Sequence, residues 1–186
     1  SVPVEAGPSL LSVEDLRVFF HIEAGTVRAV DGVTLSVQRG QAVGLVGESG
    51  CGKTITGMSV LGLLQPPGRI EGGRILFRGR TDSQTVDLAG LDPRGDQIRA
   101  IRGAEIAIVF QEPMTSLNPV YTVGDQIAEA VLVHRRVTRR DARDQAVEML
   151  QRVGLPQPHR IAGEYPHQLS GGMRQRAMIA MALSCD

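Results

Sequence analysis

The feature that most constrains this chain is a glycine-rich loop that contains its only lysine. Residues 47–54 read Gly-Glu-Ser-Gly-Cys-Gly-Lys-Thr and match the pattern G-x-x-x-x-G-K-[ST] at every fixed position. The short apolar run 42–46 precedes the loop, and residues 53–64 carry apolar side chains at helical spacing. This order predicts a strand buried on both faces, a loop and a helix, which is the local arrangement that holds phosphate groups.

The fixed positions of the loop have distinct physical roles. Glycines let successive backbone N–H groups turn toward phosphate oxygens, and the following helix adds its positive N-terminal end. Lys53 would place its ammonium on the β- and γ-phosphates of a nucleotide, and Thr54 would give Mg²⁺ a hydroxyl ligand. Cys51 occupies a free position of the pattern, so a catalytic thiol is not expected there. The predicted binding residues are Gly47, Glu48, Ser49, Gly50, Cys51, Gly52, Lys53 and Thr54. A glycine-rich turn that binds nothing is the alternative.

Composition excludes several classes of protein. The chain has 186 residues, of which 42% are apolar, so one globular domain is expected and disorder is not. With 20 Lys plus Arg against 20 Asp plus Glu, no overall basic field favours nucleic acid or anionic lipid, and any such surface must be local. No apolar run is long enough to span a membrane, and the first residues do not resemble a signal peptide. A cytosolic chain is therefore predicted. Cys51 and Cys185 form no CxxC pair, and reduced thiols are expected.

Strand patterns dominate the first part of the chain and helix patterns the second. Alternating or apolar runs predict strands at 10–22, 27–37, 70–79 and 106–110, while 80–100 has the character of a polar loop. Beyond Pro113, Thr122 with Asp125 and Thr138 with Asp141 fit the capping box that begins a helix. The second of these helices should bury Ala142, Ala146, Met149, Leu150 and Val153 and end at Gly154. A third helix is predicted from Ser170 to about Leu183.

A second anion site is predicted at the start of this third helix. Residues 169–176 read Leu-Ser-Gly-Gly-Met-Arg-Gln-Arg. Ser170 is a good N-cap, and Gly171 and Gly172 leave the first helical amides uncovered, so that a phosphate can approach closely. Because one nucleotide does not need two such loops, this one is predicted to serve a nucleotide held by another subunit or domain.

These motifs together resemble those of the ATP-binding cassette (ABC) ATPases. The sequence LSGGMRQR is similar to their LSGGQ signature, GESGCGKT to their Walker A loop, and Phe110-Gln111-Glu112-Pro113 to their Q-loop. The resemblance covers the whole chain. It implies an α/β P-loop NTPase core with an N-terminal antiparallel β subdomain and an α-helical subdomain. The implied divisions are 1–111 for the nucleotide-binding core, 112–168 for the helical subdomain and 169–186 for the signature and its helix.

The resemblance also implies roles for individual residues. ATP and Mg²⁺ are the implied cofactors, with Lys53 and Gln111 as catalytic residues and Thr54 and Gln111 at the metal. Gln111 would also couple the site to membrane subunits, and Glu112 would contact them. Ser170, Gly171 and Gly172 would bind the nucleotide of the partner. Phe19 or Phe20 would stack on adenine, with an ordinary position facing the core as the alternative for both.

A finer resemblance points to one branch of the family. Residues 110–119, 121–127 and 165–176 resemble the dipeptide, oligopeptide and nickel importers, in which Met173 is usual, and the insertion at 85–91 looks most like that of the glutathione importer ATPase. This implies an importer ATPase on the cytoplasmic face of the membrane. Its implied partners are a second ABC ATPase subunit or domain, transmembrane permease subunits and, indirectly, a periplasmic or extracellular solute-binding protein, with no nucleic acid.

The Walker B motif, the D-loop and the switch histidine of the family are not found in this sequence. Walker B, an apolar run that ends in Asp-Glu, does not occur, because the run 106–110 already leads into the Q-loop. In the family, the Walker B strand and the next one lie between the strands that precede Walker A and the Q-loop. We therefore expect an incomplete core sheet and little or no ATP hydrolysis by residues 1–186.

Two alternatives to an importer remain open. One is a soluble ABC ATPase that acts on DNA or ribosomes, although no coiled-coil insertion separates Gln111 from Ser170. The other is a nucleotide-binding module that does not hydrolyse ATP. His167 is expected to make local hydrogen bonds rather than to act in catalysis. The five arginines between 135 and 143 are interpreted as a solvated helix face, because no aromatic residues lie among them.

Overall fold

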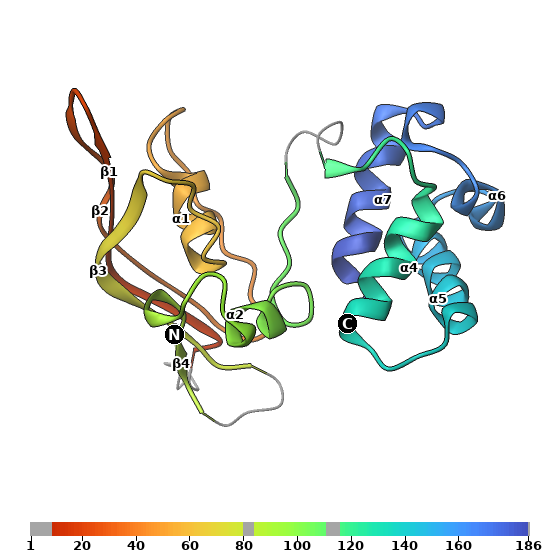
Figure 1. The fold of residues 1–186 in the computed structure, drawn as a ribbon, viewed down its shortest axis with the longest axis horizontal. Helices are drawn as coiled ribbons and strands as arrows, with labels where there is room; N and C mark the ends of the chain where they lie inside the picture. The colour runs from red at the N-terminus through yellow and green to blue at the C-terminus, as the bar shows by residue number, and fades with distance from the viewer. Residues whose placement is uncertain (1–8, 80–83, 111–115, 186) are drawn as a thin grey trace, which may run out of the picture. The chain divides into compact units, whose positions relative to one another are not determined.

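An antiparallel sheet organises the first part of the chain (Figure 1). The computed structural model describes residues 9–79, 84–110 and 116–185, and contacts divide the chain into two units after Arg99. The sheet holds β1 (Leu11–Ile22), β2 (Gly25–Val37), β3 (Gly68–Phe77) and β4 (Val86–Asp87) in the spatial order β2-β1-β3-β4. The strands predicted at 10–22, 27–37 and 70–79 are confirmed.

A bulge in β1 sets which side chains face the core. Asp15 has a φ of 47°, and the pairing register shifts on both sides of it. The extra residue moves the apolar pattern by one position, so that Val13, Leu16 and Val18 are all fully buried. Strict alternation would have placed Leu16 on the opposite face from Val13.

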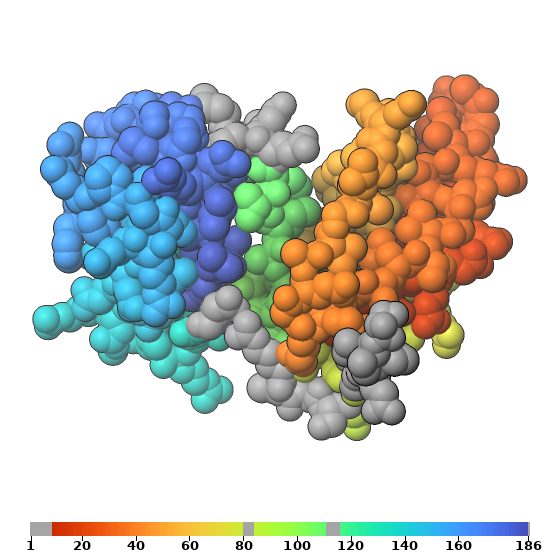
Figure 2. All heavy atoms as spheres, turned by 180° about the vertical axis from the view of Figure 1, so that it is seen from behind, coloured from red at the N-terminus to blue at the C-terminus, as the bar shows by residue number. Residues whose placement is uncertain are grey.

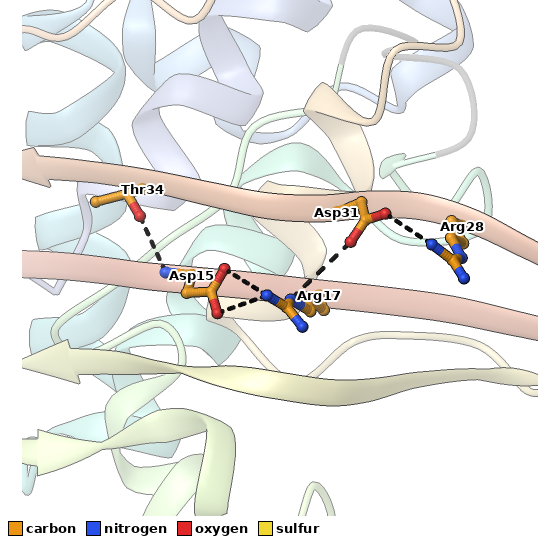
Figure 3. A network of polar contacts seen from close by, with 5 residues as sticks. All are labelled: Asp15, Arg17, Arg28, Asp31 and Thr34. Atoms are coloured by element: carbon orange, nitrogen blue, oxygen red, sulfur yellow. Dashed lines mark hydrogen bonds and ion pairs between the residues drawn. The ribbon is translucent and has the colours of Figure 1, made fainter.

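A polar network lies on the exposed side of this bulge (Figure 3). The Asp15 backbone N–H donates to Thr34 Oγ1 at 3.0 Å, and the Asp15 carboxylate pairs with Arg17 at 3.0 Å. Arg17 reaches Asp31 at 4.0 Å, and Arg28 donates to the same carboxylate at 3.3 Å. Because all four charged side chains are exposed, each ion pair adds at most about 1 kcal/mol.

Short elements complete the first unit. Helix α1 (Lys53–Val60) lies over one face of the sheet and ends at Val60, four residues earlier than the predicted end near 64. The chain turns there because Gly62 adopts a φ of +60°. The segment predicted as a loop also holds β4, the single turn η1 (Leu88–Gly90) and the start of α2 (Asp96–Ile101). Asp87 stabilises them, since its carboxylate accepts from the backbone N–H groups of Ile75 and Ala89 at 3.0 and 3.1 Å.

The two buried strands predicted at 42–46 and 106–110 do not form. Val43, Leu45 and Val46 are 45%, 47% and 94% exposed, and no described residue pairs with them as a strand. In the second segment only a single bridge joins Arg102 to Ile106, and Phe110 is 39% exposed. The prediction was wrong for a physical reason: a central strand needs neighbouring strands to accept its backbone hydrogen bonds, and the described residues supply none.

Four helices pack around one core in the second unit (Figure 1). They are α4 (Val123–His134), α5 (Arg139–Arg152), α6 (Pro158–Ala162) and α7 (Gly171–Leu183), with the turn η2 (Pro166–Gln168) before α7. The three predicted helices are confirmed, whereas α6 and η2 were not predicted. No helix among the described residues is both long and apolar enough to cross a bilayer. The predicted boundary between 111 and 112 lies outside the described residues.

The predicted caps determine where these helices begin. Thr122 and Ser170 accept from the backbone N–H groups of Asp125 and Met173 at 3.2 and 3.3 Å. Thr138 and Asp141 form a complete reciprocal capping box at the start of α5. After the other end of α5, Gly154 adopts a φ of +72°, which turns the chain away from the helix. The buried face of α5 includes Ala142, Ala146, Met149 and Leu150, as predicted.

Candidate nucleotide-binding site

The glycines of loop 47–54 hold it against the sheet. Gly50 and Gly52 have φ values of +83° and +89°, which other residues rarely adopt. Gly52 is the N-cap of α1, and a Cβ there would collide with the backbone carbonyl of Ala29 and stand 3.3 Å from Val30 Cγ2. The loop therefore packs directly on β2. Ala29 and Val30 were not predicted as neighbours of the loop, because no sequence pattern marks a contact between distant segments.

Lys53 points back into its own loop. Its ammonium donates to the carbonyl oxygens of Gly47 at 2.8 Å and Glu48 at 2.6 Å, and it lies 3.4 Å from Cys51 Sγ. The loop carbonyls thus hold the positive charge at the place where the motif predicts phosphate. An ammonium has three donors, and the weak thiol contact leaves one of them available to a phosphate oxygen.

The first turn of α1 offers further donors. The backbone N–H groups that open a helix have no partner within it, and Thr56 is the first to bond back, to Gly52 O at 2.8 Å. Thr54 is exposed on this turn, and its hydroxyl makes no hydrogen bond to any described residue. The donor set fits an anionic phosphate, and the Thr54 hydroxyl is a suitable oxygen ligand for Mg²⁺. No group of three or more His, Cys, Asp or Glu side chains among the described residues could hold a metal by itself.

The two candidate aromatic residues lie on opposite faces of β1. Val18 and Val30 are cross-strand partners and share a face, which is the face that carries the loop because Val30 contacts the Gly52 position. Phe20 lies two residues beyond Val18 in regular pairing with β3, so its side chain has this same orientation.

Phe19 has the other orientation. The guanidinium of Arg28 lies 5.4 Å from the centroid of its ring, across the strand pair from Phe19. The sequence left Phe19 and Phe20 as equal candidates, and the sheet geometry favours Phe20 as the aromatic side chain on the same face as the phosphate loop.

The predicted second anion site lies at the start of α7. Ser170 caps the helix, and Gly171 and Gly172 are exposed. A Cβ built at either glycine would meet nothing within 4 Å, so the protein interior does not require glycine there. This differs from Gly52, where the interior excludes any side chain. The two glycines leave the backbone N–H groups of this first turn uncovered, which is the geometry that an anion would require.

The remaining predicted residues divide between the described and undescribed parts of the chain. Gln111 and Glu112 lie outside the described residues. Loop 47–54 belongs to the first unit and Ser170 to the second, and each is described within its own unit. The His167 ring stacks on Tyr165 at 5.7 Å between centroids, and its side chain makes no hydrogen bond to a described residue.

Comparison with known proteins identifies close relatives. The sequence profile described as ABC transporter matches residues 30–186. A Brucella abortus protein named for peptide import and ATP binding is 54% identical over 178 residues, which cover 95% of this chain and 52% of the relative. The dipeptide transport ATP-binding protein DppD of Bacillus subtilis is 47% identical over 178 residues, with 95% and 51% covered. The glutathione import ATP-binding protein GsiA of Salmonella choleraesuis is 48% identical over 177 residues, with 95% and 28% covered.

Solved structures share the fold. The dimeric structure of MJ0796, described as a bacterial ABC transporter cassette, has a TM-score of 0.79 at 25% identity and covers 94% of this chain and 69% of that one. The structure of cbiO1 from Clostridium perfringens, described as part of the ABC transporter complex cbiONQ, has a TM-score of 0.69 at 25% identity, with 96% and 62% covered. The chain spans about half the length of the first relatives that it matches.

Proposed function

Because this chain belongs to the ABC transporter family, we propose that it is the ATP-binding part of an importer ATPase that takes up peptides or similar small solutes. The observation that carries the proposal is the loop at 47–54, in which Lys53 is held by loop carbonyls beside the open N–H groups of α1. The names of the relatives support peptides as the class of cargo. Glutathione is the narrower possibility, supported by the similarity to GsiA.

In this proposal the chain's own residues bind and orient the nucleotide. The open backbone N–H groups of the loop and of the first turn of α1, together with the Lys53 ammonium, hold the β- and γ-phosphates, and Phe20 stacks on the base. Thr54, with Gln111, provides oxygen ligands for Mg²⁺, which when bound would neutralise charge on the phosphates.

The signature residues act on a second nucleotide. Ser170, Gly171 and Gly172 present the open end of α7 to the γ-phosphate of ATP held by another ABC ATPase subunit or domain. The dimeric structure of MJ0796 supports this arrangement. Closure of the pair would drive transmembrane permease subunits, with a solute-binding protein delivering cargo. The membership of cbiO1 in the ABC transporter complex cbiONQ supports assembly with further subunits. The subunit then lies on the cytoplasmic face of the membrane.

Calorimetry of ATP binding with Mg²⁺ tests the nucleotide site. Lys53→Ala should weaken binding at least about 100-fold, because a charge-assisted bond to phosphate is lost at a site built around it. Arg94→Ala is the matched control, since it removes one exposed positive charge from the same unit and its side chain makes no ion pair with a described residue. Equal loss in both variants, or equal retention, would contradict the assignment.

A second pair of variants tests the base-stacking residue. Phe20→Ala should weaken ATP about tenfold but leave inorganic triphosphate binding unchanged, because stacking on an aromatic ring contributes roughly 1–3 kcal/mol per base. Phe19→Ala should leave both affinities unchanged, since its ring faces Arg28. Loss of ATP affinity in Phe19→Ala alone would reverse the assignment.

Hydrolysis is expected to be weak in residues 1–186. The sequence holds no acidic pair after a buried apolar run to orient the attacking water and support the metal. Release of phosphate from ATP by the purified chain, measured beside Lys53→Ala, tests this. Turnover at or above about one per second that depends on Lys53 would contradict it.

A further inference from the structure

Positive charge is concentrated at the turn between α4 and α5. Residues 132–143 contain five arginines and one acidic residue, Asp141, which gives this segment a net charge of +4. Since the whole chain has a net charge of zero, the remaining residues carry −4. The cationic surface is thus local, in a protein that is otherwise acidic.

Three of these five arginines have no ion pair with a residue that the structure describes. Arg136, Arg139 and Arg140 are exposed, and their side chains form no ion pair with any described residue. The other exposed arginines of the same helix differ, because Arg143 pairs with Asp125 at 3.2 Å and Arg152 with Glu148 at 2.6 Å.

Their position is also unfavourable for the helix. Arg139 and Arg140 occupy the first turn of α5, where the helix dipole disfavours positive charge, and Arg136 lies two residues before its cap. Asp141 lies in the same turn and interacts with Arg140, so it offsets part of this positive charge but leaves the turn with a net positive charge. A local rule that the fold compensates only in part points to a role outside the fold.

Exposed aliphatic side chains lie next to this charge. At the end of α4, Val133 is 70% exposed and Leu132 is 37% exposed. We call Leu132, Val133, Arg136, Arg139 and Arg140 the cationic corner. Figure 2 shows the turquoise segment between α4 and α5 projecting at the lower edge of its unit, so that its side chains are accessible.

We propose that the cationic corner binds the surface of a bilayer that contains anionic phospholipid. Guanidinium groups match phosphate in geometry and charge, and clusters of arginine near a membrane are attracted to anionic headgroups. Val133 and Leu132 would enter the boundary between headgroups and acyl chains, as aliphatic residues of interfacial helices do.

Lipid is favoured over nucleic acid by the neighbours of the arginines. Proteins that bind single-stranded nucleic acid place aromatic side chains between their basic residues for stacking, and residues 132–143 contain no aromatic ring other than His134. Aliphatic side chains contribute to membrane insertion but give little to a polyphosphate backbone. The proposal needs no nucleotide, so its outcome is independent of the ATP-binding experiments.

Vesicle flotation of the full chain tests the proposal without nucleotide. Vesicles of phosphatidylcholine with about 30% phosphatidylglycerol should bind the chain, and vesicles of phosphatidylcholine alone should not. Combined Arg136→Gln, Arg139→Gln and Arg140→Gln should weaken binding about 100-fold, or about fivefold for each arginine. The control removes the same charge from exposed arginines of the first unit, as Arg69→Gln, Arg94→Gln and Arg99→Gln, and should leave binding within about twofold.

Val133→Ser separates a membrane from a soluble polyanion. It should weaken vesicle binding about fivefold, because an apolar side chain no longer enters the interface, and leave binding to polyuridylate RNA unchanged. The proposal is overturned if no vesicle binds, if both triple variants bind like the parent, or if RNA binds more tightly than vesicles and Val133→Ser affects neither.

Discussion

Similar apolar side chains are buried in the helical unit and exposed in the segment before the phosphate loop. Val123, Ile127 and Leu150 of the helices are fully buried in one shared core. In the segment that leads into the loop, Val46 is 94% exposed although it belongs to an equally apolar run. The difference lies in the backbone: a helix satisfies its own hydrogen bonds, whereas a central strand depends on neighbours.

The two regions are therefore held in place by different kinds of interaction. The helices make their backbone hydrogen bonds within themselves, and their caps are formed by residues three positions apart. The phosphate loop is positioned by β2 through Gly52 and by α1, so it holds its local geometry even where the strand before it does not form.

The largest expected effect is the loss of stability when an apolar side chain is shortened in each of these two regions. Leu150→Ala should lower the free energy of unfolding of the helical unit by about 3 kcal/mol, because it leaves a cavity in a fully buried site. Val46→Ala should change stability by less than about 0.5 kcal/mol. Urea unfolding followed by circular dichroism measures both. A comparable loss in Val46→Ala would mean that 42–46 is packed in solution and would break the comparison.

Glycine substitutions should give the next largest effect. Gly52→Ala should destabilise the first unit by about 2 kcal/mol and abolish ATP binding, since a Cβ at a φ of +89° would strike the Ala29 carbonyl. Gly171→Ala should leave stability unchanged or raise it by up to about 1 kcal/mol, because its Cβ meets open space in a helix.

Two measurements on Gly52→Ala and Gly171→Ala test this prediction. Thermal unfolding reports the stability of each variant, and calorimetry with ATP reports the loop. If Gly171→Ala lost ATP affinity to the same extent as Gly52→Ala, the distinction between an internally required and an externally required glycine would be wrong.

The same distinction explains how much could be predicted from sequence. The helices at Thr122, Thr138 and Ser170 were predictable because capping and apolar spacing are local properties. The phosphate loop was predictable because its glycines and Lys53 act within eight residues. That residues 42–46 do not form a strand could not be predicted, because strand formation depends on pairing partners that the run itself does not specify. The bulge at Asp15 and the choice between Phe19 and Phe20 likewise depend on register between strands.

The smallest effect concerns the pH dependence of the α5 cap, and it tests whether local contacts alone stabilise the helical unit. The Thr138 hydroxyl donates to Asp141 Oδ2 at 2.6 Å and lowers the pKa of the Asp141 carboxyl below its ordinary 3.8, with further help from the Thr138 backbone N–H and the charge of Arg140. The carboxylate therefore stabilises the folded chain fully above about pH 4, and this contribution disappears as the pH falls through the lowered pKa. The stability difference between the parent and Asp141→Asn should be constant near neutral pH and shrink below pH 4 in acid titrations followed by circular dichroism.

Asp144→Asn, an exposed acid of the same helix outside the cap, should show a smaller difference at neutral pH. Thr138→Ala, which removes the cap itself, should cost about 1 kcal/mol. If Asp141→Asn and Asp144→Asn were indistinguishable at every pH, the start of α5 would be fixed by the packing of its buried face, and the contrast between locally ordered helices and partner-dependent strands would weaken.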